Sequence, residues 1–174
     1  MVIVIVYNGT RQVNGSLKLF HIRKKGIASV IGQVEQIGQK LIYLADDEPT
    51  IREALLTFLE DAGYEVQAFE TGDLLLAAFA ERPADMVILD VMMPGSNGFS
   101  VSKELRRTSH VPIFILSARD SDLDYQTGLD LGCDDFFTKP VSPMNVVMRV
   151  KAMFRRIAYE REALLGTLKN DAVL

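Results

Sequence analysis

Apolar residues follow two alternating patterns from Leu41 onward. Short apolar runs that end at a polar residue predict buried strands, and these lie at 41–45, 64–68, 86–89, 113–116 and 136–138. The stretches between them predict helices over 49–62, 73–81, 99–107, 120–131 and from 143 past 159. Because uninterrupted apolar strands are typical of a sheet covered on both faces, we expect an α/β fold with a doubly wound, five-stranded parallel sheet.

The last predicted helix carries a seven-residue repeat. Val150, Ile157 and Leu164 recur at this spacing, and Ser142 is a suitable N-cap. Gly166 indicates that the helix ends soon afterwards. Residues 160–174 are therefore expected to form a helix extension or a linker.

Residues 1–39 do not share the alternation. The run from Val2 to Tyr7 is strand-like, and Asn8-Gly9 and Asn14-Gly15 are hairpin turn signals, which predicts a small β-meander. Three interpretations stay open for this extension. It is a real element that decorates the domain, or sequence added in cloning, or upstream sequence translated because the start was set too early, with Val30 or Val34 as the true start. We favour the last two together over the first.

Composition is that of an ordinary globular protein, with 48% hydrophobic and 24% charged residues in a chain of 174. A single cysteine excludes a disulfide framework. The first apolar run is too short for a membrane helix, and basic residues follow it instead of preceding it, so we expect a cytoplasmic protein. Net charge is +5 over 1–40 and −8 over 41–159. The acidic body argues against direct nucleic-acid binding.

The polar residues at the strand ends carry the chemistry. Asp46 and Asp47 follow the first strand, Asp90 the third, Ser117 the fourth and Lys139 the fifth, so all five gather at the carboxyl edge of the sheet. Crowded carboxylates repel one another, which would raise the pKa of each. Because carboxylates without His or Cys suit magnesium, we expect Mg²⁺ among the acids and Lys139 opposite it, with room for a tetrahedral dianion between them.

In that setting Asp90 is a candidate nucleophile toward phosphorus. Mg²⁺ and Lys139 would offset the charge on the transferring group. The Ser117 hydroxyl would donate to a phosphoryl oxygen. The ring of Phe136, three residues before Lys139, would report by its burial whether Ser117 has moved.

Four segments, in this order along the chain, resemble the receiver domain of two-component response regulators. They are Leu44–Pro49, Val87–Pro94 with Gly98, Leu116–Asp120 and Gly132–Pro140. The resemblance covers residues 40–159. The part from Ser117 to Arg156 looks most like the winged-helix (OmpR/PhoB-like) transcription-factor subfamily.

The resemblance implies a phosphorylation site with Mg²⁺ as cofactor. Asp90 would accept a phosphoryl group from the phosphohistidine of a sensor histidine kinase. Asp47 would bind Mg²⁺ directly, Asp46 largely through water, and the backbone carbonyl of Met92 would be a further ligand. The chain would then be a signalling switch that assists its own phosphorylation and dephosphorylation, and not an enzyme acting on other substrates.

The resemblance also implies how the switch is built. Ser117 and Phe136 would form the switch pair, although Phe136 stands where the subfamily usually has Tyr. Lys139 would contact the phosphoryl group, next to a cis Lys139–Pro140 peptide bond. The strand order would be 2-1-3-4-5, and phosphorylation would shift an existing equilibrium between inactive and active states.

Members of this subfamily pair, when phosphorylated, through helix 4, strand 5 and helix 5, using ion pairs between protomers. Asp135 and Arg149 match that pattern. Tyr125 and Asn145 stand where the pattern has a basic and an acidic residue. We therefore expect a homodimer on this face that is weaker than usual or repacked through Tyr125.

The subfamily carries a DNA-binding domain after the receiver, and only 15 residues follow Tyr159 here. The output domain is thus expected to be absent, through truncation or because the protein is a lone receiver. A pseudo-receiver acting by protein–protein contacts alone is the alternative function, and the presence of all five site residues argues against it. An aspartate-based phosphatase would need its nucleophile after the first strand, and a flavin binder would need a Gly-rich loop there.

Overall fold

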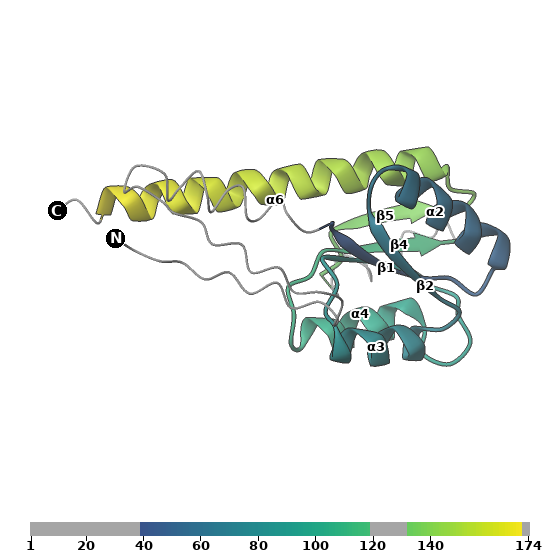
Figure 1. The fold of residues 1–174 in the computed structure, drawn as a ribbon. Coiled ribbons are helices and arrows are strands. Elements are labelled where there is room, and N and C mark those ends of the chain that lie inside the picture. The colour runs from purple at the N-terminus through teal and green to yellow at the C-terminus, as the bar shows by residue number, and fades with distance from the viewer. Residues whose placement is uncertain (1–38, 119–131, 172–174) are drawn as a thin grey trace, which may run out of the picture. The chain divides into compact units, whose positions relative to one another are not determined.

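Five parallel strands form one sheet in the order β2-β1-β3-β4-β5 (Figure 1). The computed structural model describes residues 39–118 and 132–171. The strands are β1 (Leu41–Ala45), β2 (Glu65–Phe69), β3 (Met86–Asp90), β4 (Ile113–Ser117) and β5 (Asp135–Thr138). The predicted fold class and strand order are confirmed.

Within the described residues, four helices cover the sheet. They are α2 (Pro49–Asp61), α3 (Gly72–Glu81), α4 (Gly98–Arg106) and α6 (Pro143–Asp171). Thr71 and Asn97 cap α3 and α4, because their side-chain oxygens accept the backbone N–H groups of Leu74 and Ser100. The turn after α2 has Gly63 at φ 94°, a conformation that favours glycine. The helix predicted over 120–131 and the β-meander predicted within 1–39 lie outside the described residues.

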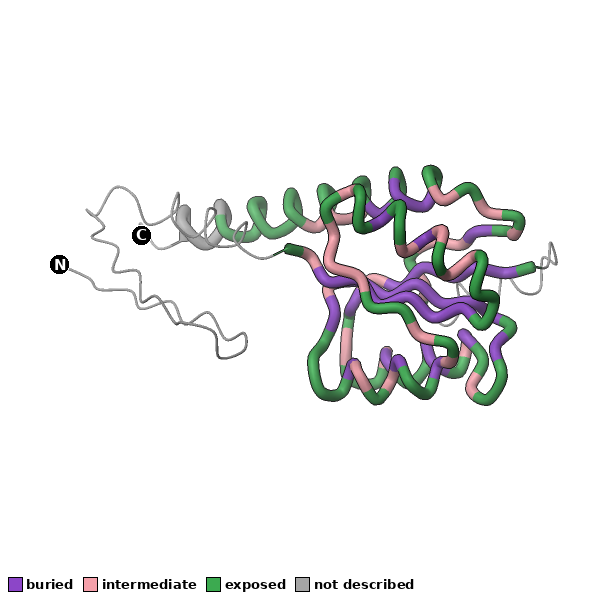
Figure 2. Tube along the Cα trace, turned by 45° about the vertical axis from the view of Figure 1, so that its right-hand side comes forward, coloured by how far each residue is buried: buried purple, intermediate pink, exposed green. Residues whose placement is uncertain are grey.

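The buried strands lie between helices on both sides (Figure 2). The sheet separates two apolar clusters. On one face, side chains of β1, β3 and β4 pack against Leu75 and Phe79 of α3 and against α4. On the other face, alternate residues of the same strands pack against Leu55 and Leu59 of α2 and against Val146 and its neighbours in α6. Burial on both faces explains why the central strands read as continuous apolar runs.

Helix α6 continues into the predicted helix extension. It passes through Gly166 and is described as far as Asp171, five residues later. One glycine inside a helix costs only about 1 kcal/mol relative to alanine. The preceding turns are good helix formers, and Arg156 and Glu160 form an ion pair of 2.8 Å at the i, i+4 spacing, which supports the extension.

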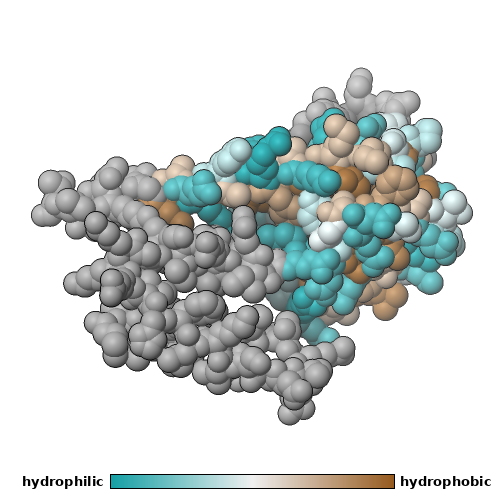
Figure 3. Space-filling model, turned by 45° about the horizontal axis from the view of Figure 1, so that its top comes forward, coloured by the Kyte–Doolittle hydropathy of each residue, from teal (hydrophilic) through white to brown (hydrophobic). Residues whose placement is uncertain are grey.

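The surface over α2 and α6 is mixed in character (Figure 3). Hydrophilic side chains lie beside exposed apolar residues such as Phe58, Met144 and Met148. Within residues 39–118 and 132–171, no helix combines the length and the apolar character that a bilayer span requires.

Candidate functional site

The carboxyl ends of four neighbouring strands stop at nearly the same level. Strand pairing sets Ala45 beside Leu89, Asp90 beside Leu116 and Ser117 beside Thr138. The residues that end or follow β1, β3, β4 and β5 are therefore brought together at one edge. These are the positions of Asp46, Asp47, Asp90, Ser117 and Lys139.

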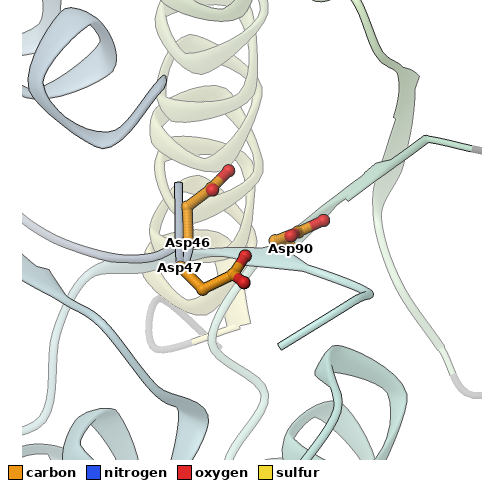
Figure 4. Close-up of side chains that lie close together, drawn as sticks. All are labelled: Asp46, Asp47 and Asp90. Atoms are coloured by element: carbon orange, nitrogen blue, oxygen red, sulfur yellow. The ribbon is translucent and has the colours of Figure 1, made fainter. Parts of the chain in front are cut away.

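Three carboxylates form a cluster at this edge (Figure 4). Each of Asp46, Asp47 and Asp90 offers a ligand oxygen, and these oxygens lie within 4.8 Å of one another. Asp46 and Asp90 are buried, with 0% and 2% of their surface exposed, whereas Asp47 is exposed. The cluster thus combines two buried carboxylates with one that is exposed to solvent.

Lys139 holds the buried part of the cluster together. Its ammonium nitrogen lies 3.0 Å from Oδ2 of Asp46 and 3.2 Å from Oδ2 of Asp90. Burial alone would lower the pKa of Lys139, but the contacts with Asp46 and Asp90 outweigh it and the pKa is raised. Lys139 is therefore a fixed positive charge beside Asp90.

Burial, more than mutual repulsion, dominates the electrostatics of the acids. Desolvation is the largest cause that raises the pKa of Asp90 to about 6, and the charge of Asp46 adds to it against the opposing effect of Lys139. Desolvation also raises the pKa of Asp46. Repulsion, the cause expected from the sequence, is the smaller contribution, because both side chains are buried at the strand ends.

The cluster fits a divalent cation. Oδ1 of Asp90 is buried and accepts no hydrogen bond from the described residues, which leaves a carboxylate oxygen in need of a positive partner. Lys139 neutralises only one charge among three acids. Oxygen donors without His or Cys are the ligand set that Mg²⁺ prefers.

The switch candidates lie on adjacent strands. Ser117 is buried at the end of β4, and Phe136 is half-buried in β5 against the core on the α3 and α4 side. Phe136 pairs with Ile115, two residues before Ser117, so Phe136 and Ser117 share a face of the sheet. Met92 has 56% of its surface exposed in the loop after β3.

The residues predicted for a dimer face are partly visible. Arg149 donates from Nη1 to both carboxylate oxygens of Asp135, at 3.0 and 2.9 Å, within the same chain. Asn145 is exposed in the first turns of α6. Tyr125 lies outside the described residues.

Comparison with known protein families shows to which family a chain with this site belongs. The family profile described as response regulator receiver domain matches residues 42–151, which include the five site residues. The chain belongs to the response regulator receiver family.

Curated relatives of this receiver are transcriptional and sensory regulators. It is 42% identical over 120 residues to the regulatory protein VanRc of Enterococcus gallinarum, a match that covers 69% of this chain and 51% of the relative. It is 37% identical over 121 residues to the transcriptional regulatory protein BaeR of Escherichia coli, covering 70% and 50%. The chain spans about half the length of these relatives.

Solved structures give the same result. A Francisella response regulator receiver domain superposes with a TM-score of 0.65 at 32% identity and covers 68% of this chain and 99% of that one. The chemotaxis protein CheY4 of Vibrio cholerae superposes with a TM-score of 0.63 at 30% identity, covering 66% and 98%. The described sheet therefore has the receiver fold.

Two residues at the receiver's site were missed by reasoning from the sequence. Glu48, directly after the aspartate pair, places Oε1 3.2 Å from the Lys139 ammonium. Arg52 in α2 donates from Nη1 to the backbone carbonyls of Asp46 and Asp47, at 2.7 and 3.3 Å. Each lies near Asp47 in the chain. Neither ends or directly follows a strand, so the pattern of polar residues at strand ends does not point to them.

Proposed function

We propose that this receiver accepts a phosphoryl group on Asp90 and thereby switches the output of a two-component signalling system. The observation that supports it best is the pairing of Asp90 with Lys139 on one side, while its other carboxylate oxygen is buried without a hydrogen-bond donor among the described residues. A phosphoacceptor carboxylate needs one oxygen to attack phosphorus and the other to contact a cation, and the pairing of Asp90 with Lys139 leaves Oδ1 without a donor for one of these roles.

The transfer is a displacement at phosphorus. A carboxylate oxygen of Asp90 forms the new P–O bond while the P–N bond to the donor imidazole breaks, and the electron pair of that bond leaves with the imidazole nitrogen. The Lys139 ammonium takes up charge on the phosphoryl oxygens. Asp46, Asp47, Asp90 and the Met92 carbonyl would hold Mg²⁺, which offsets negative charge on the phosphoryl group when bound.

Asp90 is suited to this chemistry only when it is ionised. Its pKa of about 6 leaves most of the population ionised at neutral pH. The raised pKa also makes the carboxylate a stronger base, and hence a better nucleophile, than an exposed aspartate.

The response would pass from Asp90 to Ser117 and Phe136. Ser117 would donate to the new phosphoryl oxygens, and the half-buried ring of Phe136 would follow it inward. Because the curated relatives include transcriptional regulators, control of transcription is the output we propose for residues 40–159, with a histidine kinase as donor. The alternative function is that of a pseudo-receiver, which binds partners without being phosphorylated.

Dimerisation through α6, β5 and the preceding helix would require a change of partners. Asp135 and Arg149 now pair with each other inside one chain, so pairing between protomers must break this contact. We expect a dimer when the receiver is loaded with beryllofluoride, weaker than is usual for the subfamily or repacked through Tyr125. Analytical ultracentrifugation would measure it, and a persistent monomer at high protein concentration with beryllofluoride would contradict it.

The central test is covalent labelling. The receiver is incubated with Mg²⁺ and a small phosphodonor, and intact mass is recorded. We expect one added phosphoryl group in the wild type, none in Asp90→Asn, and none after chelation of the metal. Absence of labelling in the wild type, or labelling that survives Asp90→Asn, would reject the proposed function.

A further inference from the structure

Lys139 contacts three carboxylates at once. Besides Asp46 and Asp90, its ammonium donates to Oε1 of Glu48 at 3.2 Å. An ammonium has three N–H donors and no more. Three acids therefore surround the nitrogen, at 3.0, 3.2 and 3.2 Å, before any phosphoryl group arrives.

The three carboxylates differ in position. The side chains of Asp46 and Asp90 are 0% and 3% exposed, whereas that of Glu48 is 59% exposed. Glu48 stands at the N-cap position of α2, but its side chain makes no capping hydrogen bond. Its carboxylate is therefore the solvent-side partner of Lys139.

A donor that approaches Asp90 from solvent must place a phosphoryl oxygen on the same ammonium. Since Asp46 and Asp90 are buried in the floor of the site, Glu48 is the partner that must leave. We propose that Glu48 is a specificity-determining residue of this receiver, which disfavours small doubly anionic phosphodonors by occupying Lys139 and by its own negative charge. This inference rests on the proposed phosphorylation of Asp90.

The chemistry of the donors makes the proposal specific. Acetyl phosphate brings two negative charges, while phosphoramidate brings a nitrogen-linked phosphoryl group with a protonated nitrogen and one net negative charge. The carboxylate of Glu48 repels the first more strongly, and it has an attractive partner in the nitrogen of the second. The ratio of the two rates therefore reports on Glu48 specifically.

The experiment compares three substitutions in the whole chain. Glu48→Gln removes the charge and weakens the contact with Lys139, and Glu48→Asp keeps the charge but shortens the side chain. Glu60→Gln is the matched control, because Glu60 is an exposed glutamate in the last turn of the same helix, about 18 Å along its axis. Rates are measured by intact mass at subsaturating donor and saturating Mg²⁺.

We expect Glu48→Gln to raise the rate with acetyl phosphate about two- to fivefold, the range set by loss of one exposed ion pair. The rate with phosphoramidate should rise less or fall, so that the ratio of the two rates changes. Glu48→Asp should show a smaller increase, and Glu60→Gln should match the wild type.

Each other result rejects the inference. An unchanged rate ratio in Glu48→Gln would show that Glu48 does not select the donor. An equal effect of Glu60→Gln would assign the change to net charge, and a slower reaction of Glu48→Gln with acetyl phosphate would assign Glu48 to support of the metal. Absence of phosphorylation in the wild type would instead reject the proposed function, and this inference with it.

Discussion

Charged residues are paired differently at the two edges of the sheet, the amino edge where the parallel strands begin and the carboxyl edge where they end. At the amino edge, the acids Glu65 and Asp85 are each paired with a basic side chain. Arg82 and Glu65 form a two-point ion pair at 2.6 and 2.9 Å, and Asp85 accepts from Lys40 and from the backbone N–H of Leu41. At the carboxyl edge, buried acids share one lysine and keep an oxygen without a hydrogen-bond donor.

The pKa shifts express the same difference. The contact with Arg82 lowers the pKa of Glu65, so the charged form is favoured in the folded state. Burial raises the pKa of Asp90 to about 6, so there the charged form is disfavoured. The amino edge thus stabilises the fold, whereas the carboxyl edge costs stability and gains a reactive, cation-binding group in exchange.

The largest expected effect is a steric loss of stability. It distinguishes Gly98, at the carboxyl edge, from Gly63, at the amino edge. A Cβ on Gly98 would overlap the backbone carbonyl of Asp90, whereas a Cβ on Gly63 would meet nothing within 4 Å. We expect Gly98→Ala to lower the free energy of unfolding by about 3 kcal/mol and to slow phosphorylation. Gly63→Ala should cost about 1 kcal/mol, from its positive φ alone.

Urea unfolding and the labelling assay measure both variants. Equal destabilisation by Gly98→Ala and Gly63→Ala would show that backbone contact does not constrain the phosphoacceptor edge. Loss of labelling in Gly63→Ala would show that the two edges are not independent.

A smaller effect is expected from the buried charge itself. Asp90→Asn should raise the free energy of unfolding of the metal-free receiver by about 2 kcal/mol at pH 7.5, since the ionised carboxylate is disfavoured in the folded state. Between its ordinary pKa and about 6, the folded state holds a proton that the unfolded state has lost. The stability contributed by Asp90 therefore falls as pH rises through this window.

The gain from Asp90→Asn should accordingly vanish near pH 4, which urea unfolding in the presence of a chelator measures. A gain that persists unchanged at low pH would mean that burial of charge is not its cause.

The smallest expected effect is a loss of stability at the amino edge. Glu65→Gln should lower the free energy of unfolding, whereas Asp90→Asn should raise it. Because the pKa of Glu65 is lowered in the folded state, its contribution to the free energy of unfolding is present above its ordinary pKa and is lost as pH falls. Its side chain is 38% exposed, so screening limits the loss at pH 7.5 to about 0.5 kcal/mol. If Glu65→Gln stabilised the receiver at neutral pH, the contrast between the two edges would be wrong.

Much of this arrangement follows from local sequence rules. Apolar runs such as Leu41–Ala45 and Met86–Asp90 predict buried strands, and the strand order follows from the family resemblance. The carboxyl edge was predictable for the same reason: a polar residue that ends a buried strand marks the edge, and parallel strands share it. The exact end of α6 could not be predicted, because a single glycine is a weak signal against several turns of helix-forming residues.

The sequence by itself determined the fold class and the residue types available at the site, because both depend on the spacing of apolar and polar positions along the chain. The tertiary structure alone decided how those residues are paired and buried. Glu48 became a partner of Lys139 only because β1 and β5, far apart in sequence, end at the same edge. Burial and not repulsion came to set the pKa of Asp90, since desolvation depends on the whole chain packed around a side chain.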